Sequence, residues 1–209
     1  SRPYVILTSN FDLPARYYGP FDQLRVPFTI RTIIQVLRNE QTRNVNMAGS
    51  KGRVAIITGA GQGIGRAYAR AYAKAGIIPV IVDVEGDNIM AVQDLINQEN
   101  DIQCLAIEAD ITNPNQIAAM TEKTIKKYGR IDILVNNAAL FSSLTACPAL
   151  DIPLEEWKRV MDVNITGQFI CTQAVLPNMI KNNWGRIINI SSGTVTMGLT
   201  NLLHYVTSK

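Results

Sequence analysis

The sequence predicts the α/β fold class with a doubly wound parallel sheet, and three observations support it. Apolar segments rich in β-branched residues alternate with segments of helical periodicity from residue 53 onward. The strand-like segments are apolar on both faces, which is typical of a parallel sheet covered by helices on both sides. A glycine-rich turn directly follows the first of these strands. We expect one such domain over residues 47–209.

The predicted strands are short apolar runs bounded by turn residues. There are five of them, at residues 54–58, 78–83, 103–109, 131–135 and 186–190. The segments between the strands have apolar residues at helical spacing. They are predicted to be helices at 63–75, 88–100, 114–128 and 156–182, the last as two helices that meet around 163–167.

The first 46 residues differ in composition from the rest and are predicted to be a leader. They contain six arginines but no lysine, and they carry the whole net charge of +3. Only residues 29–40 have apolar side chains at helical spacing. Three interpretations stay open: an organelle presequence, an accessory segment, or an artefact or translated leader upstream of a natural start at Met47. We favour the third, because the chain begins with Ser1.

Composition excludes several classes of protein. Of the 209 residues, 47% are hydrophobic and 18% are charged, which indicates a globular domain. No apolar run approaches the roughly 18 residues of a membrane span. The net charge of +3 is too small and too dispersed for a nucleic-acid-binding protein. With three scattered cysteines and one histidine, we predict no metal site and expect a reducing, cytoplasmic compartment.

Residues 59–65 form a glycine-rich turn between a predicted strand and a predicted helix. From Thr58 the sequence is Thr-Gly-Ala-Gly-Gln-Gly-Ile-Gly. Glycine lets the backbone turn tightly and approach a pyrophosphate, and the helix N-terminus adds N–H donors and partial positive charge. A P-loop is excluded, because no Gly-Lys-Ser/Thr follows. The turn predicts a dinucleotide site with contacts from Gly59, Gly63, Ile64 and Gly65.

Asp83 closes the second predicted strand, 18 residues beyond Gly65. A carboxylate at this place accepts hydrogen bonds from both ribose hydroxyls of a dinucleotide and repels a 2′-phosphate. This position therefore favours NAD over NADP as the cofactor. The alternative is that Asp83 only caps the turn that follows it.

Polar residues also follow the third and fourth predicted strands. Asp110 is placed to meet the adenine edge of a dinucleotide, or alternatively to cap the helix that begins near Pro114. The sequence Asn-Asn-Ala-Ala at 136–139 has small residues that let the backbone pass close to a ligand. Asn136 and Ala138 are therefore candidate cofactor contacts, although an asparagine amide here can equally tie adjacent strands together.

A serine, a tyrosine and a lysine lie near the end of the chain. Tyr205 and Lys209 are four residues apart and share one face of a helix. An ammonium beside a phenol stabilises the phenolate, which lowers the tyrosine pKa from about 10 and suits it to move a proton at an alcohol or carbonyl oxygen. Ser192 could hydrogen-bond the same oxygen. His204 points about 100° away from Tyr205 on the helix, so we expect it in a pocket wall.

Taken together, these motifs resemble the short-chain dehydrogenase/reductase family over residues 52–209. The resemblance rests on the glycine turn, the Asn136 segment, Asn164, and the 13-residue interval from Ser192 to Tyr205 with Lys209 four residues later. It is most similar in character to the 3-oxoacyl-carrier-protein reductases and secondary-alcohol dehydrogenases. It implies a Rossmann-type fold and a homo-oligomer at full length.

The resemblance also implies an oxidoreductase that transfers a hydride between NAD(P) and the carbon of a small-molecule alcohol or carbonyl substrate. Tyr205 would be the acid/base and Ser192 would orient the substrate oxygen. Lys209 would lower the Tyr205 pKa and bind the nicotinamide ribose. Asn164 would hold a water that links Lys209 to solvent.

The family pattern continues beyond Lys209, by roughly 80 to 90 residues of a single domain. We therefore expect the last strands and the substrate loop to be missing, and the chain by itself to be inactive. A catalytically inactive NAD-binding module is the alternative, and a methyltransferase is disfavoured because it has no use for Ser192, Tyr205 and Lys209. The apolar stretch 140–153 is compatible with hydrophobic ketones, acyl thioesters or secondary alcohols.

Overall fold

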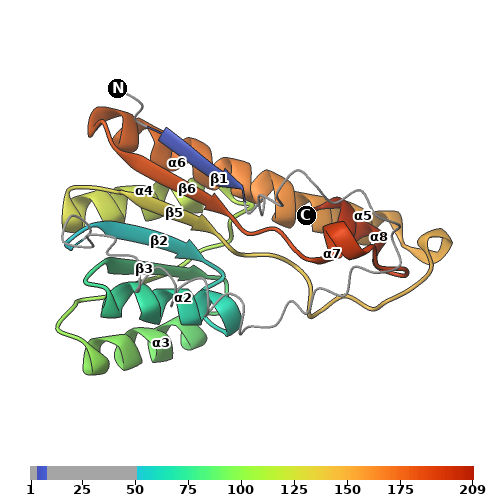
Figure 1. The fold of residues 1–209 in the computed structure, drawn as a ribbon, viewed down its shortest axis with the longest axis horizontal. Helices are drawn as coiled ribbons and strands as arrows, with labels where there is room; N and C mark the ends of the chain where they lie inside the picture. The colour runs from blue at the N-terminus through green and yellow to red at the C-terminus, as the bar shows by residue number, and fades with distance from the viewer. Residues whose placement is uncertain (1–3, 9–50) are drawn as a thin grey trace, which may run out of the picture. The chain divides into compact units, whose positions relative to one another are not determined.

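The computed structural model describes residues 4–8 and 51–209. The predicted helix at 29–40 and the predicted boundary between residues 46 and 47 lie outside the described residues. The described chain forms one parallel sheet in the order β1-β6-β5-β2-β3-β4, with helices on both faces (Figure 1). From β4 to β6 this is the order of a doubly wound Rossmann sheet. The predicted fold class is confirmed.

Five strands match the predicted ones. Their bounds are β2 Val54–Thr58, β3 Ile78–Asp83, β4 Leu105–Glu108, β5 Ile133–Asn136 and β6 Gly185–Asn189. β4 and β5 begin two residues later than predicted, because side chains take their first backbone groups. The Cys104 N–H donates to Asn97 Oδ1 at 2.8 Å. The Ile131 N–H donates to Asn178 Oδ1 at 2.8 Å.

One strand was not predicted from the sequence. β1 (Tyr4–Thr8) pairs in parallel with β6, with Tyr4 opposite Gly185 and Thr8 opposite Asn189. The sequence analysis assigned this segment to the leader and found no regular element in it. Pairing with the otherwise open edge of β6 supplies the hydrogen bonds that define the strand, and local sequence does not show such a partner.

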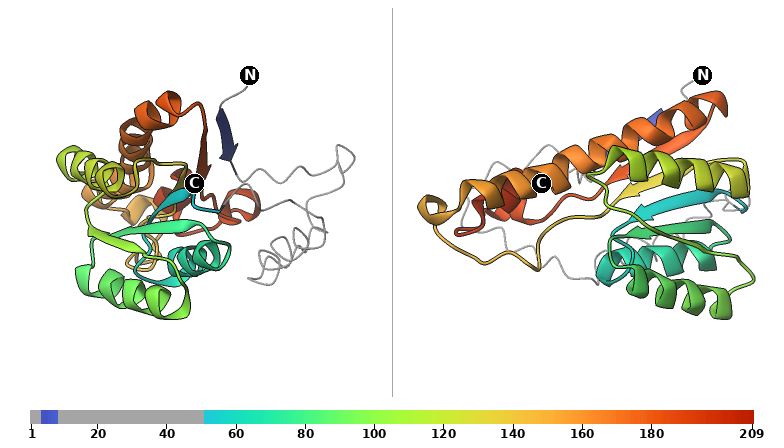
Figure 2. Two further views of the ribbon diagram at one scale, coloured as in Figure 1. Left: turned by 90° about the vertical axis from the view of Figure 1, so that its left-hand side faces the viewer. Right: turned by 180° about the vertical axis from the view of Figure 1, so that it is seen from behind.

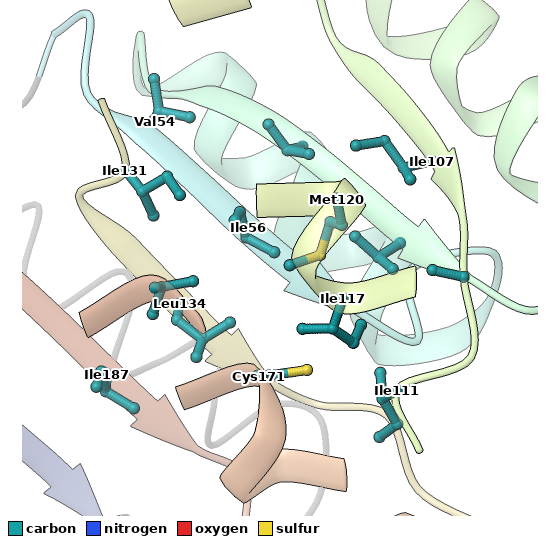
Figure 3. Close-up of a cluster of buried hydrophobic side chains, with 14 of the residues drawn as sticks. Val54, Ile56, Ile107, Ile111, Ile117, Met120, Ile131, Leu134, Cys171 and Ile187 are labelled. Carbon is teal, nitrogen blue, oxygen red and sulfur yellow. The ribbon is translucent and has the colours of Figure 1, made fainter. Parts of the chain in front are cut away.

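Helices cover the two faces of the sheet (Figure 2), and each face has its own cluster of buried apolar residues. α2 (Gly63–Lys74) and α3 (Gly86–Glu99) pack on one face, against Ala55 and Ile57 of β2. α4 (Pro114–Tyr128) and α6 (Gln168–Lys181) pack on the other, against Val54 and Ile56. Figure 3 shows this second cluster, where Met120 of α4 and Cys171 of α6 meet the sheet. Alternate residues of β2 thus enter two cores, as its apolar sequence predicts.

The long helical region after β5 differs from the prediction in how its two parts join. α5 (Leu154–Met161) leads through a π-helical turn, η3 (Asp162–Gly167), directly into α6. The sequence predicted two helices meeting here, but the junction stays helical. A Cβ at Gly167 would lie 2.7 Å from the Ile111 side chain, so glycine is needed for this close packing.

The chain after β6 forms two short helices, α7 (Thr194–Met197) and α8 (Leu203–Thr207). A single 3₁₀ turn, η2 (Ala149–Asp151), lies in the segment after β5. In Figure 1 the arrowheads of β5 and β6 lead toward α7 and α8, which lie beyond the carboxyl edge of the sheet. Within residues 4–8 and 51–209, no helix is long and apolar enough to span a bilayer.

Candidate active site

The glycine-rich turn lies at the point where the strand order reverses, between β2 and β5. Gly59 has φ +64°, and a Cβ there would lie 2.7 Å from the Ala138 Cα. A Cβ on Gly65 would overlap the Gly59 carbonyl oxygen. Gln62, the N-cap residue of α2, does not cap the N–H groups of the first helical turn with its side chain. This close-set backbone fits a dinucleotide, whose pyrophosphate needs glycine and helix N–H groups at this crevice.

Gly63 and Ile64 open α2 on the outer side of the turn. Gly63 has φ +52°, and a Cβ there would meet no atom within 4 Å. The Ile64 side chain is 47% exposed. Both residues therefore face open space at the helix N-terminus, which is where their predicted contact with a cofactor would be made.

Asp83 lies beside the turn, at the end of β3. Its Oδ2 accepts a hydrogen bond from the Gly61 N–H at 2.9 Å, and its Oδ1 accepts from the Val84 N–H at 2.8 Å. The carboxylate thus links β3 to the glycine turn and also holds the turn that follows it. The predicted ribose contact and the alternative capping role use the same two oxygens.

Asp110 does not cap α4. Its Oδ1 accepts from the Thr112 N–H and the Thr112 hydroxyl, both at 2.8 Å. The helix cap is Asn113, whose side chain accepts from the N–H groups of Asn115 and Gln116. The alternative that Asp110 caps the helix before Pro114 is therefore wrong, because the residue next to the proline takes that role. The adenine contact of Asp110 stays a prediction.

Asn136 ties the sheet to α6. The side chain is 1% exposed, and its Nδ2 donates to Asn189 Oδ1 at 2.9 Å and to Thr172 Oγ1 at 3.2 Å. This is the strand-tying alternative for the segment. Ala138 lies against Gly59 instead, so it is the member of this segment that borders the glycine turn. A cofactor contact by either residue stays a prediction.

Tyr205 and Lys209 come from α8 and the residues after it. Tyr205 is 8% exposed, and its ring lies 4.7 Å from the Phe141 ring between centroids. The Lys209 ammonium donates to the Ile190 carbonyl at 3.2 Å and lies 5.7 Å from the Tyr205 ring centroid. Burial lowers the pKa of Lys209 to about 8. The Ile190 carbonyl after β6 thus holds the lysine next to the tyrosine. The predicted shared helix face is not formed, because α8 ends at Thr207 and Lys209 lies beyond it.

Two serines follow β6 in the chain and have different hydrogen-bond partners. Ser192 Oγ accepts from the Thr194 N–H at 3.2 Å and from the Thr194 hydroxyl at 3.0 Å, at the start of α7. Ser191 Oγ donates to the Lys209 carbonyl at 3.2 Å. Ser191 therefore joins the end of β6 to Lys209 together with the Ile190 carbonyl, and the sequence analysis gave Ser191 no role. The predicted substrate contact of Ser192 stays a prediction.

Asn164 lies in the π-helical turn and is 2% exposed. Its Oδ1 accepts from the Leu140 N–H at 2.8 Å, and its Nδ2 donates to Ser208 Oγ at 2.8 Å. Ser208 Oγ in turn donates to the Tyr205 carbonyl at 2.7 Å. Asn164 thus connects the segment after β5 to the helix that carries Tyr205.

Comparison with known proteins decides the class of this site. Residues 53–209 match the short chain dehydrogenase family. The chain belongs to this family. An uncharacterized oxidoreductase of Thermotoga maritima is 38% identical over 142 residues, which cover 68% of this chain and 54% of that protein. A 3-oxoacyl-[acyl-carrier-protein] reductase of Synechocystis sp. is 36% identical over 160 residues, which cover 75% of this chain and 62% of that protein.

A solved structure supports the same assignment. The crystal structure of an NAD⁺-bound xylitol dehydrogenase aligns with a TM-score of 0.72 at 29% identity, and the match covers 77% of this chain and 60% of that one. The chain spans little more than half the length of these short-chain dehydrogenase relatives. The family resemblance and the Rossmann-type fold predicted from the motifs are confirmed.

Sequence analysis missed two residues that brace the glycine turn of this short-chain dehydrogenase domain. Asn137 Nδ2 donates to the Thr58 carbonyl at 3.0 Å and to the Gly59 carbonyl at 3.1 Å. The Thr58 hydroxyl accepts from the N–H groups of Asn137 and Ala138, both at 3.1 Å. The sequence feature that could have pointed to Asn137 is the pair of adjacent asparagines after the fourth predicted strand. In the structure the two side chains have different partners, the sheet and α6 for Asn136 and the glycine turn for Asn137.

His204 is not in a pocket wall, as the sequence analysis expected. It is fully buried, and its Nε2 lies 3.0 Å from Glu156 Oε1 of α5, at an angle short of a hydrogen bond. The expectation was wrong because α5 packs against α8 and buries the His204 side chain beside Glu156. Cys104 and Cys171 are buried, and burial raises the pKa of each thiol to about 12, which fits packing residues. No group of three metal-ligating side chains occurs among the described residues.

Proposed function

We propose that this domain carries out hydride transfer between NAD and the carbon of a secondary alcohol or carbonyl compound, with Tyr205 as the acid/base. The observation that carries the proposal is the partly buried Lys209 ammonium, which donates to the Ile190 carbonyl after β6 and lies 5.7 Å from the Tyr205 ring centroid. NAD, when bound, supplies the hydride acceptor. The residues of the chain hold the substrate oxygen and move its proton.

Tyr205 and Lys209 act as a pair in this proposal. An ammonium near a phenol favours the phenolate, which takes the hydroxyl proton of an alcohol as the hydride leaves the carbon. Lys209 also binds the nicotinamide ribose. Ser192 orients the substrate oxygen. Asn164 holds the water that connects Lys209 to solvent, and its bond to Ser208 fixes it relative to Tyr205.

The cofactor side of the proposal rests on the glycine turn and Asp83. Gly59, Gly63, Ile64 and Gly65 border the pyrophosphate, and the Asp83 carboxylate selects the free ribose of NAD over the 2′-phosphate of NADP. Asp110 meets the adenine edge, and Asn136 and Ala138 border the cofactor where the backbone passes close to it. We further propose that the whole protein works in the cytoplasm as a homo-oligomer, on a small-molecule substrate.

The test is Tyr205→Phe in the full-length protein, with Tyr68→Phe on α2 as the matched control. We expect Tyr205→Phe to lower kcat by at least about 100-fold, because a general acid/base is lost. NADH affinity, measured by fluorescence titration, stays unchanged in both variants, and Tyr68→Phe keeps full activity. If Tyr205→Phe stays active, Tyr205 is not the acid/base. If no variant turns over any alcohol or ketone while NADH still binds, the domain is the inactive binding module.

A further inference from the structure

Two segments contain no formally charged residue: the one that carries Tyr205 and the one that carries Phe141, whose ring lies against Tyr205. Residues 138–150, after β5, and residues 190–208, after β6, have no Asp, Glu, Lys or Arg, although 18% of the chain is charged. The one titratable base in them, His204, is fully buried against Glu156. The charged residues that directly follow these two segments in the chain are Asp151 and Lys209.

The same segments expose large apolar side chains. Phe141 is 50% exposed, and four residues between β6 and Tyr205 are 41% to 64% exposed, namely Val195, Met197, Leu199 and Leu203. Exposed apolar residues that gather next to a candidate catalytic group are typical of a surface that meets an apolar ligand.

Ring and backbone contacts hold these segments together at Tyr205. The Phe141 ring lies 4.7 Å from the Tyr205 ring, with the planes tilted by 45°. The Cys147 N–H donates to the Asn201 carbonyl at 2.9 Å, which joins the two segments directly. The Leu140 N–H donates to Asn164. The apolar surface therefore borders the atoms that the proposed reaction uses.

We propose that the substrate is an uncharged secondary alcohol or ketone with an apolar group, aryl or branched alkyl, on the reacting carbon, and that Phe141 is a specificity-determining residue for that group. This rests on the proposed function. In oxidation the carbinol C–H bond breaks, its electron pair passes with the hydrogen to NAD⁺, and the O–H proton passes to Tyr205, which gives ketone, NADH and one proton. A carboxylate in place of that apolar group would lose its hydration beside the Phe141 ring, and residues 138–150 and 190–208 contain no Lys or Arg to pair with it.

The test compares two methyl carbinols, 1-phenylethanol and lactate, in the full-length protein with NAD⁺. We expect kcat/KM for 1-phenylethanol to exceed that for lactate by at least 100-fold. Phe141→Ala should lower kcat/KM for 1-phenylethanol about tenfold more than for 2-propanol, because only the larger substrate contacts the ring. Ile180→Ala, which shortens an exposed side chain at the far end of α6, is the control and should change neither value.

Each outcome decides the proposal. Equal or better use of lactate, or a Phe141→Ala loss that is the same for 2-propanol, would overturn the substrate class. If none of the alcohols is oxidised, titration of the NADH complex with acetophenone and pyruvate separates the two proposals. Preferential binding of acetophenone then supports the apolar site although the proposed reaction fails, and preferential binding of pyruvate overturns both.

Discussion

The glycine-rich side and the Tyr205 side of the site are held in place by different means. The glycine turn continues from β2, whose residues from Val54 to Ile57 are fully buried between two cores. The Tyr205 side rests on α8, which has five residues, and on α7, which has four. Helices that short do not hold their own conformation in water. The geometry of Tyr205 therefore depends on a few side-chain bonds, while the geometry of the glycine turn is fixed by the sheet.

The largest expected effect tests the fixed side. Gly65→Ala should destabilise the fold by about 3 kcal/mol, because the new methyl group overlaps the Gly59 carbonyl and meets Asn137 Nδ2. Gly63→Ala is the matched control, since a Cβ there meets no atom within 4 Å and only its positive φ costs energy, about 1 kcal/mol. Urea unfolding measures both. Equal losses would mean that the turn is less tightly braced than the contacts indicate.

The next prediction concerns the pH dependence of the Tyr205 side. Burial lowers the pKa of Lys209 from 10.5 to about 8, so between these pH values the unfolded chain binds more protons than the folded one. The free energy of unfolding should therefore rise with pH from about 8 toward 10.5. Lys209→Met removes this pH dependence. The free energy of unfolding of the wild type, minus that of the variant, should therefore increase as the pH rises from 7.5 to 9.5.

Lys158→Met is the control for this measurement, because the Lys158 side chain is 55% exposed. Its difference from wild type should not vary over the same range. A constant difference for Lys209→Met as well would show that the Lys209 ammonium is solvated in the folded protein.

The smallest expected effect sharpens the claim that few bonds hold α8. Ser208→Ala removes the hydroxyl that joins Asn164 to the Tyr205 carbonyl and should cost about 1–2 kcal/mol of stability. The double variant Asn164→Ala with Ser208→Ala should lose about 1 kcal/mol less stability than the sum of the two single variants. Each single change already removes the same hydrogen bond, the one between Asn164 and Ser208. The exposed Ser142→Ala should stay within about 0.5 kcal/mol of wild type. Additive losses in the urea series would show that the two residues are not coupled.

The same contrast governs what the sequence alone could predict. β2 and β3 have the predicted bounds because each is a short apolar run that ends at a turn residue or an acid. α4 also has its predicted bounds, since Pro114 opens it and Gly129, with φ +75°, closes it. The separation of Tyr205 and Lys209 by four residues brings them near one another, although α8 ends at Thr207 and Lys209 lies beyond it. These features are local, so the pattern contains them.

The features that sequence analysis missed depend on contacts between distant segments. Asn137 and Thr58 are 79 residues apart in the chain, and Asn164 and Ser208 are 44 apart. The wrong expectation for His204 has the same origin, because the packing of α5 on α8 decides which side of the helix is buried. Residue type and spacing do not specify such pairs.

The π-helical turn has a consequence for rotation along the helix axis. The buried residues on α5, η3 and α6 are Val160, Asn164, Gly167, Cys171, Val175 and Met179. Over the 19 residues from the first to the last, an unbroken α-helix would carry the buried stripe about 100° around the axis. A π-helical turn contains one extra residue, which cancels that drift. Deleting one residue from 162–167 would leave 18 positions between Val160 and Met179, which is five turns of an ordinary α-helix, so α5 would keep its rotation relative to α6 without a π-helical turn.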